Sequence, residues 1–308
     1  MTGVDRGASG PSRRGRGAWL ALFLLVLFGS AGIGLVSFLA SGGEDHSAFS
    51  VGERVGVVEV KGVIVDAKPV LDRIESFRKN GSIKAVVLRV DSPGGAVAPS
   101  QEIFEAIRSL DAKKPVVASF GSTAASGGFY VACGARHIVS NPGTLTGSIG
   151  VILEGGNYER LMEKVGVRSV VVKSGPFKDI LSPTREMTQA ERDLLQEMVQ
   201  NVYGQFVRAV MNVATRRGLD EAQLRAVADG RVLSGEQAFE KGLVDSLGTL
   251  KDAVAKAAEL AGMSGEPSVY YPEEHHSLLD KLLGGKLERW QSAVMPTGPG
   301  LYFLLPSW

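Results

Sequence analysis

Short runs of β-branched residues, each followed by a turn of small residues and then a helical pattern, limit the folds open to this chain. Residues 83–90 (IKAVVLRV) and 115–120 (PVVASF) are nearly continuous apolar runs, which are typical of strands covered on both faces. Residues 70–78 and 100–110 carry apolar residues at helical spacing. The same spacing predicts a long helix after Thr188, which forms a capping-box start with Glu191. Because strands alternate with helices in this order, the sequence predicts an α/β domain with a largely parallel sheet.

The N-terminal segment predicts a membrane anchor. Residues 1–17 contain four arginines, and residues 18–40 contain no charged residue. As a helix, residues 18–40 would be about 34 Å long at about 1.5 Å per residue, enough to cross a hydrocarbon core of about 30 Å. Arginines before the apolar stretch, with Glu44 and Asp45 after it, predict a cytoplasmic N-terminus and an extracytoplasmic body.

A cleaved signal peptide is the alternative interpretation of residues 18–40, because the small residues Ser37, Ala40 and Ser41 occur near its end. The apolar stretch is longer than the roughly 7–15 residues of a signal-peptide core, which favours an uncleaved anchor. We expect a linker over residues 41–53. A catalytic domain over residues 54–265 and a tail over 266–308 would follow.

The charge balance argues against a nucleic-acid partner, and the cysteine content excludes an intrachain disulfide. The chain has 34 basic and 33 acidic side chains, and this balance gives no reason to expect nucleic acid as a partner. Cys133 is the only cysteine, so the chain has no intrachain disulfide.

Ser126 is the candidate nucleophile. It lies in GSTAASGGFY (residues 121–130), directly after a predicted strand, and has only alanine and glycine neighbours. Small neighbours permit the strained strand-to-helix turn that presents a nucleophilic serine at a helix start. A helix N-cap serine is the simpler interpretation, and Ser122 and Thr123 are rival nucleophiles without small residues on both sides.

Two glycine-containing turns could supply the oxyanion hole. DSPGG (residues 91–95) follows a predicted strand, and paired glycines let a backbone turn sharply and direct bare N–H groups at a ligand. The N–H of Gly127 and an N–H from the Gly94–Gly95 loop could together bind an oxyanion. Taken alone, DSPGG is equally consistent with a simple tight turn between a strand and a helix.

A nucleophilic serine needs a base, and the four histidines are poorly placed. His46 lies in the predicted linker, His275 and His276 lie in an acidic tail, and His137 begins a predicted strand. A Ser-His-Asp triad is therefore not expected, although spacing alone does not eliminate His137. Adjacent residues rarely converge on one ion, so we interpret EEHH (residues 273–276) as a solvated loop.

Two lysines are the remaining candidates for the base. Lys173 and Lys178 lie in VVVKSGPFKDILSPTRE (residues 170–186), after a predicted strand at 169–173. A lysine acts as a base only when it is neutral, and a dry, apolar groove favours the neutral amine. The spacing does not choose between the two lysines.

The motifs together resemble a known family. The predicted anchor is followed by DSPGG, AASGGFY, TGSIGV (residues 146–151) and SGPFKD, in the order seen in signal peptide peptidase A, the protease IV type of S49 serine peptidase. The resemblance extends from about residue 54 to residue 262. Each motif is weak alone, but their order makes the combination specific.

The resemblance implies a role for each site residue. Ser126 is implied as the nucleophile and Lys178, in FKD, as the general base. Ser148, in TGSIG, is implied as the side chain that orients the lysine, and the backbone of Gly95 and Gly127 as the oxyanion hole. No metal or organic cofactor is implied.

The resemblance also implies a ClpP/crotonase-like fold, ring-like homo-oligomers and narrow specificity pockets for small side chains. The implied activity is endopeptidase cleavage of signal peptides left in the bacterial inner membrane, with a single-pass anchor and the catalytic domain outside the cytoplasm. With one catalytic domain per chain, a lysine contributed across a subunit boundary is possible. Alternatives are a protease acting on other membrane proteins, a crotonase-type acyl-CoA enzyme, and a non-enzymatic membrane scaffold.

Residues 292–308 (SAVMPTGPGLYFLLPSW), called the C-terminal segment below, are apolar and rich in proline and glycine. The simpler interpretation is a chain end that folds against the body. Because the segment resembles an extended hydrophobic substrate, we also expect that it can lie in the substrate groove.

Overall fold

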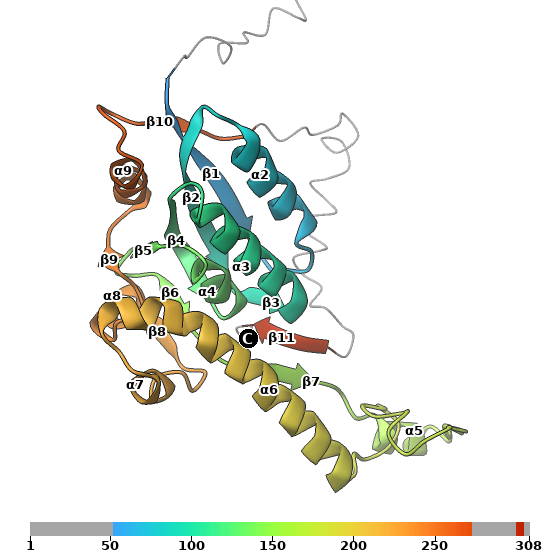
Figure 1. The fold of residues 1–308 in the computed structure, drawn as a ribbon. Coiled ribbons are helices and arrows are strands. Elements are labelled where there is room, and N and C mark those ends of the chain that lie inside the picture. The colour runs from blue at the N-terminus through green and yellow to red at the C-terminus, as the bar shows by residue number, and fades with distance from the viewer. Residues whose placement is uncertain (1–51, 273–299, 305–308) are drawn as a thin grey trace, which may run out of the picture. The chain divides into compact units, whose positions relative to one another are not determined.

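The computed structural model describes residues 52–272 and 300–304 (Figure 1). The predicted basic segment (1–17) and anchor (18–40) lie outside the described residues, as do most of the predicted linker and tail. None of the helices in the described ranges is both long enough and apolar enough to cross a membrane.

The main sheet confirms the predicted α/β domain. Its strand order is β10-β1-β2-β4-β5-β9, and each neighbouring pair is parallel. Two short strands extend the sheet, because β6 pairs in parallel with β4 while β8 is antiparallel to β6. The strands are β1 (Arg54–Lys61), β2 (Ile83–Ser92), β4 (Val116–Ala125), β5 (His137–Ser140), β6 (Leu145–Gly147), β8 (Val232–Ser234), β9 (Ser246–Leu247) and β10 (Ser268–Tyr270). Since β10 pairs with β1, the sheet continues beyond the expected domain boundary at residue 265.

Helices cover both faces of the sheet, which explains why its strands are apolar throughout. Side chains alternate between the faces of a strand, so Val57 of β1 packs in the cluster beneath α9 while Val58 packs in the larger cluster on the opposite face. That larger cluster includes buried residues of α2, α3, α4 and α6. These helices are α2 (Lys68–Lys79), α3 (Val97–Asp111), α4 (Gly127–Ala132), α6 (Gln189–Ala214) and α9 (Leu250–Leu260).

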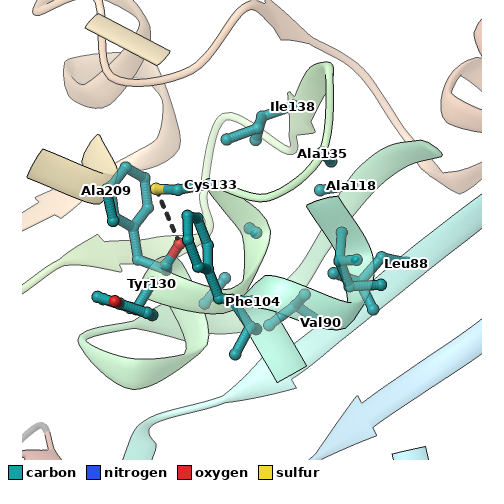
Figure 2. Packing of buried hydrophobic residues seen from close by; sticks show 14 of the residues in the cluster. Leu88, Val90, Phe104, Ala118, Tyr130, Cys133, Ala135, Ile138 and Ala209 are labelled. Carbon is teal, nitrogen blue, oxygen red and sulfur yellow. Dashed lines mark hydrogen bonds between the residues drawn. The ribbon is translucent and has the colours of Figure 1, made fainter. Parts of the chain in front are cut away.

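Packing around α4 joins three helices. The ring centroid of Tyr130 on α4 lies 5.1 Å from that of Phe104 on α3 and 5.0 Å from that of Phe206 on α6. Figure 2 shows Tyr130 and Cys133 in this cluster, with the Cys133 thiol donating to the carbonyl oxygen of Phe129 at 3.2 Å. Burial raises the pKa of the Cys133 thiol well above its ordinary value, so this cysteine is a neutral core residue.

Helix α6 begins with the expected capping box, in which Thr188 and Glu191 bond to each other's backbone N–H groups. Its C-terminal half carries most of its buried residues, whereas its N-terminal half extends beyond the sheet towards α5 (Figure 1). The described elements that complete this part of the chain are α5 (Glu159–Lys164), η1 (Thr215–Arg217), α7 (Glu221–Arg225) and α8 (Gly235–Glu240).

Residues 155–187, called the lobe below, contain little regular structure apart from α5. None of residues 151–190 is buried. The predicted strand over residues 169–173 is wrong, because this run is irregular and leaves Val170 and Val172 88% and 97% exposed. A strand needs a neighbour for its backbone groups, and no described strand pairs with this run.

A second, small sheet lies beside α4. It consists of β3 (Gly94–Ala96), β11 (Gly300–Leu304) and β7 (Ile152–Glu154), with β11 in the middle and antiparallel to both neighbours (Figure 1).

Candidate active site

Ser126 lies at the junction between β4 and α4, where it has φ 51° and ψ −117°. This backbone conformation is costly for an L-residue, and hydrogen bonds on both sides hold it. The Ser126 N–H donates to the carbonyl oxygen of Gly147 at 2.9 Å, and its carbonyl oxygen accepts from the Tyr130 N–H at 2.8 Å. The junction therefore has the strand, strained turn and helix of a nucleophile elbow.

Close backbone packing explains the glycines around this junction. A Cβ added to Gly128 would lie 2.6 Å from the carbonyl oxygen of Ser92, and one added to Gly95 would lie 2.0 Å from that of Ile64. The loop at Gly94, which has φ 104°, is fixed by the Ile64 N–H, which donates to the Gly94 carbonyl oxygen at 2.8 Å. The DSPGG loop and the start of α4 are thus held against each other.

Ser148 lies beside Ser126. Residues Ala125 and Gly147 are register partners in the parallel β4–β6 pair, so the two serines follow directly from neighbouring strand ends. Ser148 also has a positive φ, 49°, and its N–H donates to the carbonyl oxygen of Arg231 at 2.8 Å. Of the predicted site residues, the structure therefore brings together Ser126, Gly127, Ser148 and the loop containing Gly95.

Lys178 is exposed on the lobe. In Figure 1 the lobe extends away from the sheet, whereas α4 lies against it. The lobe is bound at Glu191, while α4 contacts α6 near Phe206. Glu191 and Phe206 are about 22 Å apart along α6 at about 1.5 Å per residue, which is well beyond the reach of one lysine side chain. Lys178 is therefore not next to Ser126 within one chain.

Lys173, the rival base, is committed to an ion pair. Its ammonium donates to the Asp179 carboxylate at 2.6 Å and to the carbonyl oxygen of Pro176 at 3.0 Å. Hydrogen bonds from Arg185, and then from Lys173, hold the pKa of Asp179 well below its ordinary range. Because the Lys173 ammonium is bound to Asp179, Lys178 is the better candidate for the base.

His137 is too far from Ser126 to act on it. It pairs in register with Val117, near the start of β4, whereas Ser126 follows the end of that strand, about 30 Å further on at about 3.3 Å per residue. The His137 Nε2 lies 2.9 Å from the Ser246 Oγ, and burial lowers its pKa. His46, His275 and His276 lie outside the described residues.

A groove lies between β7 and the N-terminal half of α6. Its volume is about 740 Å³, and it is lined by apolar side chains together with Arg185 and other polar residues. A second cavity, of about 410 Å³, is lined by Ser148 and Tyr203 among others. Both are lined by Val151, Ile152 and Val199, so they form adjoining parts of one hollow that runs from Ser148 towards the lobe.

The C-terminal segment reaches this part of the molecule. Its strand β11 pairs with β3 through Phe303 and Gly95, and with β7 through Leu301 and Leu153. It also contacts α4. The described part of the C-terminal segment therefore lies against the loop that contains Gly95.

In the described part of the chain, no three His, Cys, Asp or Glu side chains gather as they would around a metal ion.

Comparison with known proteins identifies the family. The model described as "Peptidase family S49" matches residues 108–264, and the one described as "Clp protease" matches residues 64–143. A candidate protease of Synechocystis sp., slr0021, is 46% identical over 77% of this chain and 85% of its own length. The chain belongs to peptidase family S49. As an S49 peptidase it is a serine-type protease with a Clp-protease-like α/β fold, as expected.

Two further relatives confirm the resemblance of this S49 peptidase to signal peptide peptidase A. A candidate signal peptide peptidase SppA of Enterococcus faecium is 36% identical, over 74% of this chain and 65% of that protein. Protease 4 of Salmonella typhi is 37% identical, over 72% of this chain but only 37% of that protein. The S49 match gives the acyl-CoA alternative no support.

The sequence of this S49 peptidase does not reveal the contacts of Asp179, Arg185 and Glu191. The spacing of Thr188 and Glu191 revealed a capping box, but nothing local showed that Arg185 also binds Glu191. Such a contact depends on how the lobe folds back on α6.

Proposed function

We propose that this S49 peptidase is a membrane-anchored endopeptidase with a Ser126–Lys178 dyad that degrades signal peptides left in the membrane. The observation that carries the proposal is the strained Ser126 elbow, held between the DSPGG loop and Ser148. Membership of family S49 supplies the reaction class.

In the proposed reaction, the Ser126 Oγ attacks the scissile carbonyl carbon while the neutral Lys178 amine accepts the hydroxyl proton. The N–H groups of Gly95 and Gly127 stabilise the oxyanion of the tetrahedral intermediate. Lys178 then returns the proton to the leaving amine, and water releases the acyl group by the same steps. Ser148 would orient the lysine amine.

We further propose that each dyad combines residues of two chains in a ring-like homo-oligomer. The separation of Lys178 from Ser126 within one chain supports this arrangement. A second support is the exposed apolar surface that the lobe carries: Tyr158, Leu161, Val165, Val167, Val170, Val171, Val172 and Phe177. Exposed apolar surface of this extent favours burial against a partner, and the adjoining groove along β7 offers apolar side chains for a neighbouring lobe.

The proposed substrate is an extended apolar peptide. Strand β11 occupies the space between β3 and β7 and pairs with both by backbone contacts, which is how sheets take up peptide strands. Its sequence, GLYFL, has the apolar character of a signal-peptide core. The predicted anchor over residues 18–40, and relatives named for signal peptide peptidase activity, support a site at the extracytoplasmic face of the bacterial inner membrane.

A labelling experiment tests the nucleophile. The full chain, purified in detergent, is treated with a fluorophosphonate, which reacts only with an activated serine. We expect labelling of the wild type and none of Ser126→Ala, with Ser122→Ala as a matched control that labels normally. Equal labelling of Ser126→Ala would refute the assignment.

A mixing experiment tests the shared dyad. Ser126→Ala lacks the nucleophile and Lys178→Met lacks the base, so each alone should fail to hydrolyse a peptide with small side chains. Coexpressed in equal amounts, the two variants should recover up to about a quarter of wild-type activity, because random mixing around a ring joins intact halves at that frequency. No recovery in mixed oligomers of verified composition would contradict a dyad formed between chains.

A further inference from the structure

The guanidinium of Arg185 lies between two carboxylates. Its Nε and Nη2 donate to the two oxygens of Asp179 at 2.9 and 2.8 Å, a bidentate contact. Its Nη1 donates to Glu191 Oε2 at 2.9 Å, and its Nη2 is also hydrogen-bonded to Glu191 Oε1. Nη2 further donates to the backbone carbonyl oxygen of Asp179 at 3.2 Å. Both the side chain and the backbone of Asp179 are therefore held.

Glu191, one of the two carboxylates that bind Arg185, is itself held in place. It is 2% exposed, and its Oε2 accepts from the Thr188 N–H at 2.9 Å and from the Thr188 hydroxyl at 3.0 Å. The Arg185 hydrogen bonds, followed by those of Thr188, lower the pKa of Glu191 to about 2. A buried carboxylate of this kind needs its cationic partner, so Arg185 is tied to the first turn of α6.

Helix α6 is in turn fixed to the helix that begins at Ser126. Phe206 and Val210 are fully buried, and the Phe206 ring packs on Tyr130 of α4. One helix thus contacts α4 at one end and holds the Lys178 loop at the other.

Within the lobe, Lys173 also binds Asp179, but this contact does not join the loop to α6. None of residues 151–190 is buried, so the lobe has no core of its own to set the course of its chain. Lys178 immediately precedes Asp179 in the chain, so a shift of the Asp179 backbone would displace the lysine as well.

We propose that Arg185 is a positioning residue that sets the location of Lys178 by holding Asp179 to Glu191 at the start of α6. This inference rests on the proposed function of Lys178 as the base. Arginine suits the role because its planar fork binds two carboxylates at once, which a lysine ammonium cannot do with the same geometry. Arg185 itself takes no proton and touches no reacting atom.

Steady-state kinetics of the full chain in detergent tests the proposal. Arg185→Ala should lower kcat by about 100-fold, the effect of a displacement of about 1 Å in a catalytic group, and leave KM within about threefold. Arg185→Lys should recover part of kcat, because lysine restores the positive charge but not the planar guanidinium. Arg108→Ala is the matched control and should leave kcat unchanged, since Arg108 pairs with Glu105 on the exposed face of α3.

A double-mutant cycle separates positioning from general structural damage. If Arg185 acts through Lys178, then Arg185→Ala should change the residual rate of Lys178→Ala by less than about twofold. A further loss of about 100-fold in that background, or a rise in KM with unchanged kcat, would overturn the proposal. Thermal melting and oligomer size of Arg185→Lys, compared with wild type, show that the kinetics report on folded protein.

The cycle also distinguishes this inference from the function on which it rests. Full activity of Lys178→Ala would overturn both. Inactive Lys178→Ala together with fully active Arg185→Ala would overturn the positioning role alone.

Discussion

Ser126 and Ser148 both have positive φ, at 51° and 49°, a backbone region that L-residues other than asparagine and aspartate seldom occupy. Each is fixed by a hydrogen bond from its N–H to a carbonyl oxygen of a neighbouring segment. Strain at two adjacent serines is a feature of functional sites. At the residue scale, the glycines between these segments are what make the close approach possible.

Gly128→Ala should destabilise the domain by about 1–3 kcal/mol, the usual cost of overpacking. The added methyl group would lie 2.6 Å from a backbone oxygen, which cannot turn aside as a side chain can. Urea denaturation measures the free energy of unfolding. Gly204→Ala, inside α6, meets only the end of the Arg208 side chain at 3.5 Å and should stabilise by up to about 1 kcal/mol. Equal effects at both positions would contradict the packing argument.

Lys178→Met and Lys173→Met should separate the two lysines kinetically. Loss of the general base should reduce kcat by about 10²–10⁴-fold in Lys178→Met. Lys173→Met removes one partner of Asp179, but Arg185 still holds that carboxylate, so we expect a loss of less than about tenfold. Peptide hydrolysis at saturating substrate gives both values. The opposite ranking would assign the base to Lys173.

Helix α6 shows at the element scale how one amphipathic helix serves two purposes. Its C-terminal half completes the core around α4, and its first turn binds the lobe through Glu191. The capping box and the apolar spacing are local, and both were predicted correctly. The expected strand at residues 169–173 failed, because β-branched residues form a strand only where a neighbouring strand accepts their backbone groups.

Stability should depend on pH through Glu191. The pKa of Glu191 in the folded protein is about 2, below the ordinary value of 4.5. As the pH falls, Glu191 is therefore protonated in the unfolded chain before it is protonated in the folded protein. The stabilisation is complete above about pH 4.5 and is lost as the pH falls towards 2. Urea midpoints should therefore show Glu191→Gln less stable than wild type at pH 7, with the gap narrowing below pH 4.5.

The control for this series is Glu236→Gln, which removes an exposed first-turn carboxylate from α8. Its gap from wild type should be small at all pH values. A gap for Glu191→Gln that stays constant from pH 7 to pH 3 would refute the assigned ionisation.

At the scale of the whole molecule, segments that are far apart in the sequence meet beside α4. Strand β11, from the C-terminal segment, lies between β3 and β7 and against α4. A peptide substrate that uses the same strand edges must displace it. The chain therefore carries a segment that would compete with a substrate for these strand edges.

Removal of residues 292–308 should lower KM for a peptide substrate. If β11 occupies these strand edges nine-tenths of the time, the apparent affinity of the full chain for substrate is reduced about tenfold, and truncation recovers that factor. A synthetic peptide of residues 298–308 should inhibit the truncated protein competitively. Unchanged KM together with no inhibition by the peptide would contradict a shared site, and mass spectrometry of the purified full chain checks that the segment is intact.

The order of strands and helices, the α4 start at Ser126 and the capping box of α6 follow from residue spacing, because each depends on neighbours within a few positions. The family resemblance added Ser148 and chose Lys178 over Lys173. Only the tertiary structure decided that Lys173 is held by Asp179, that Arg185 joins the lobe to α6, and that β11 lies between β3 and β7. Those contacts join residues through the folding of exposed loops and a distant strand, where no periodic pattern records the partner.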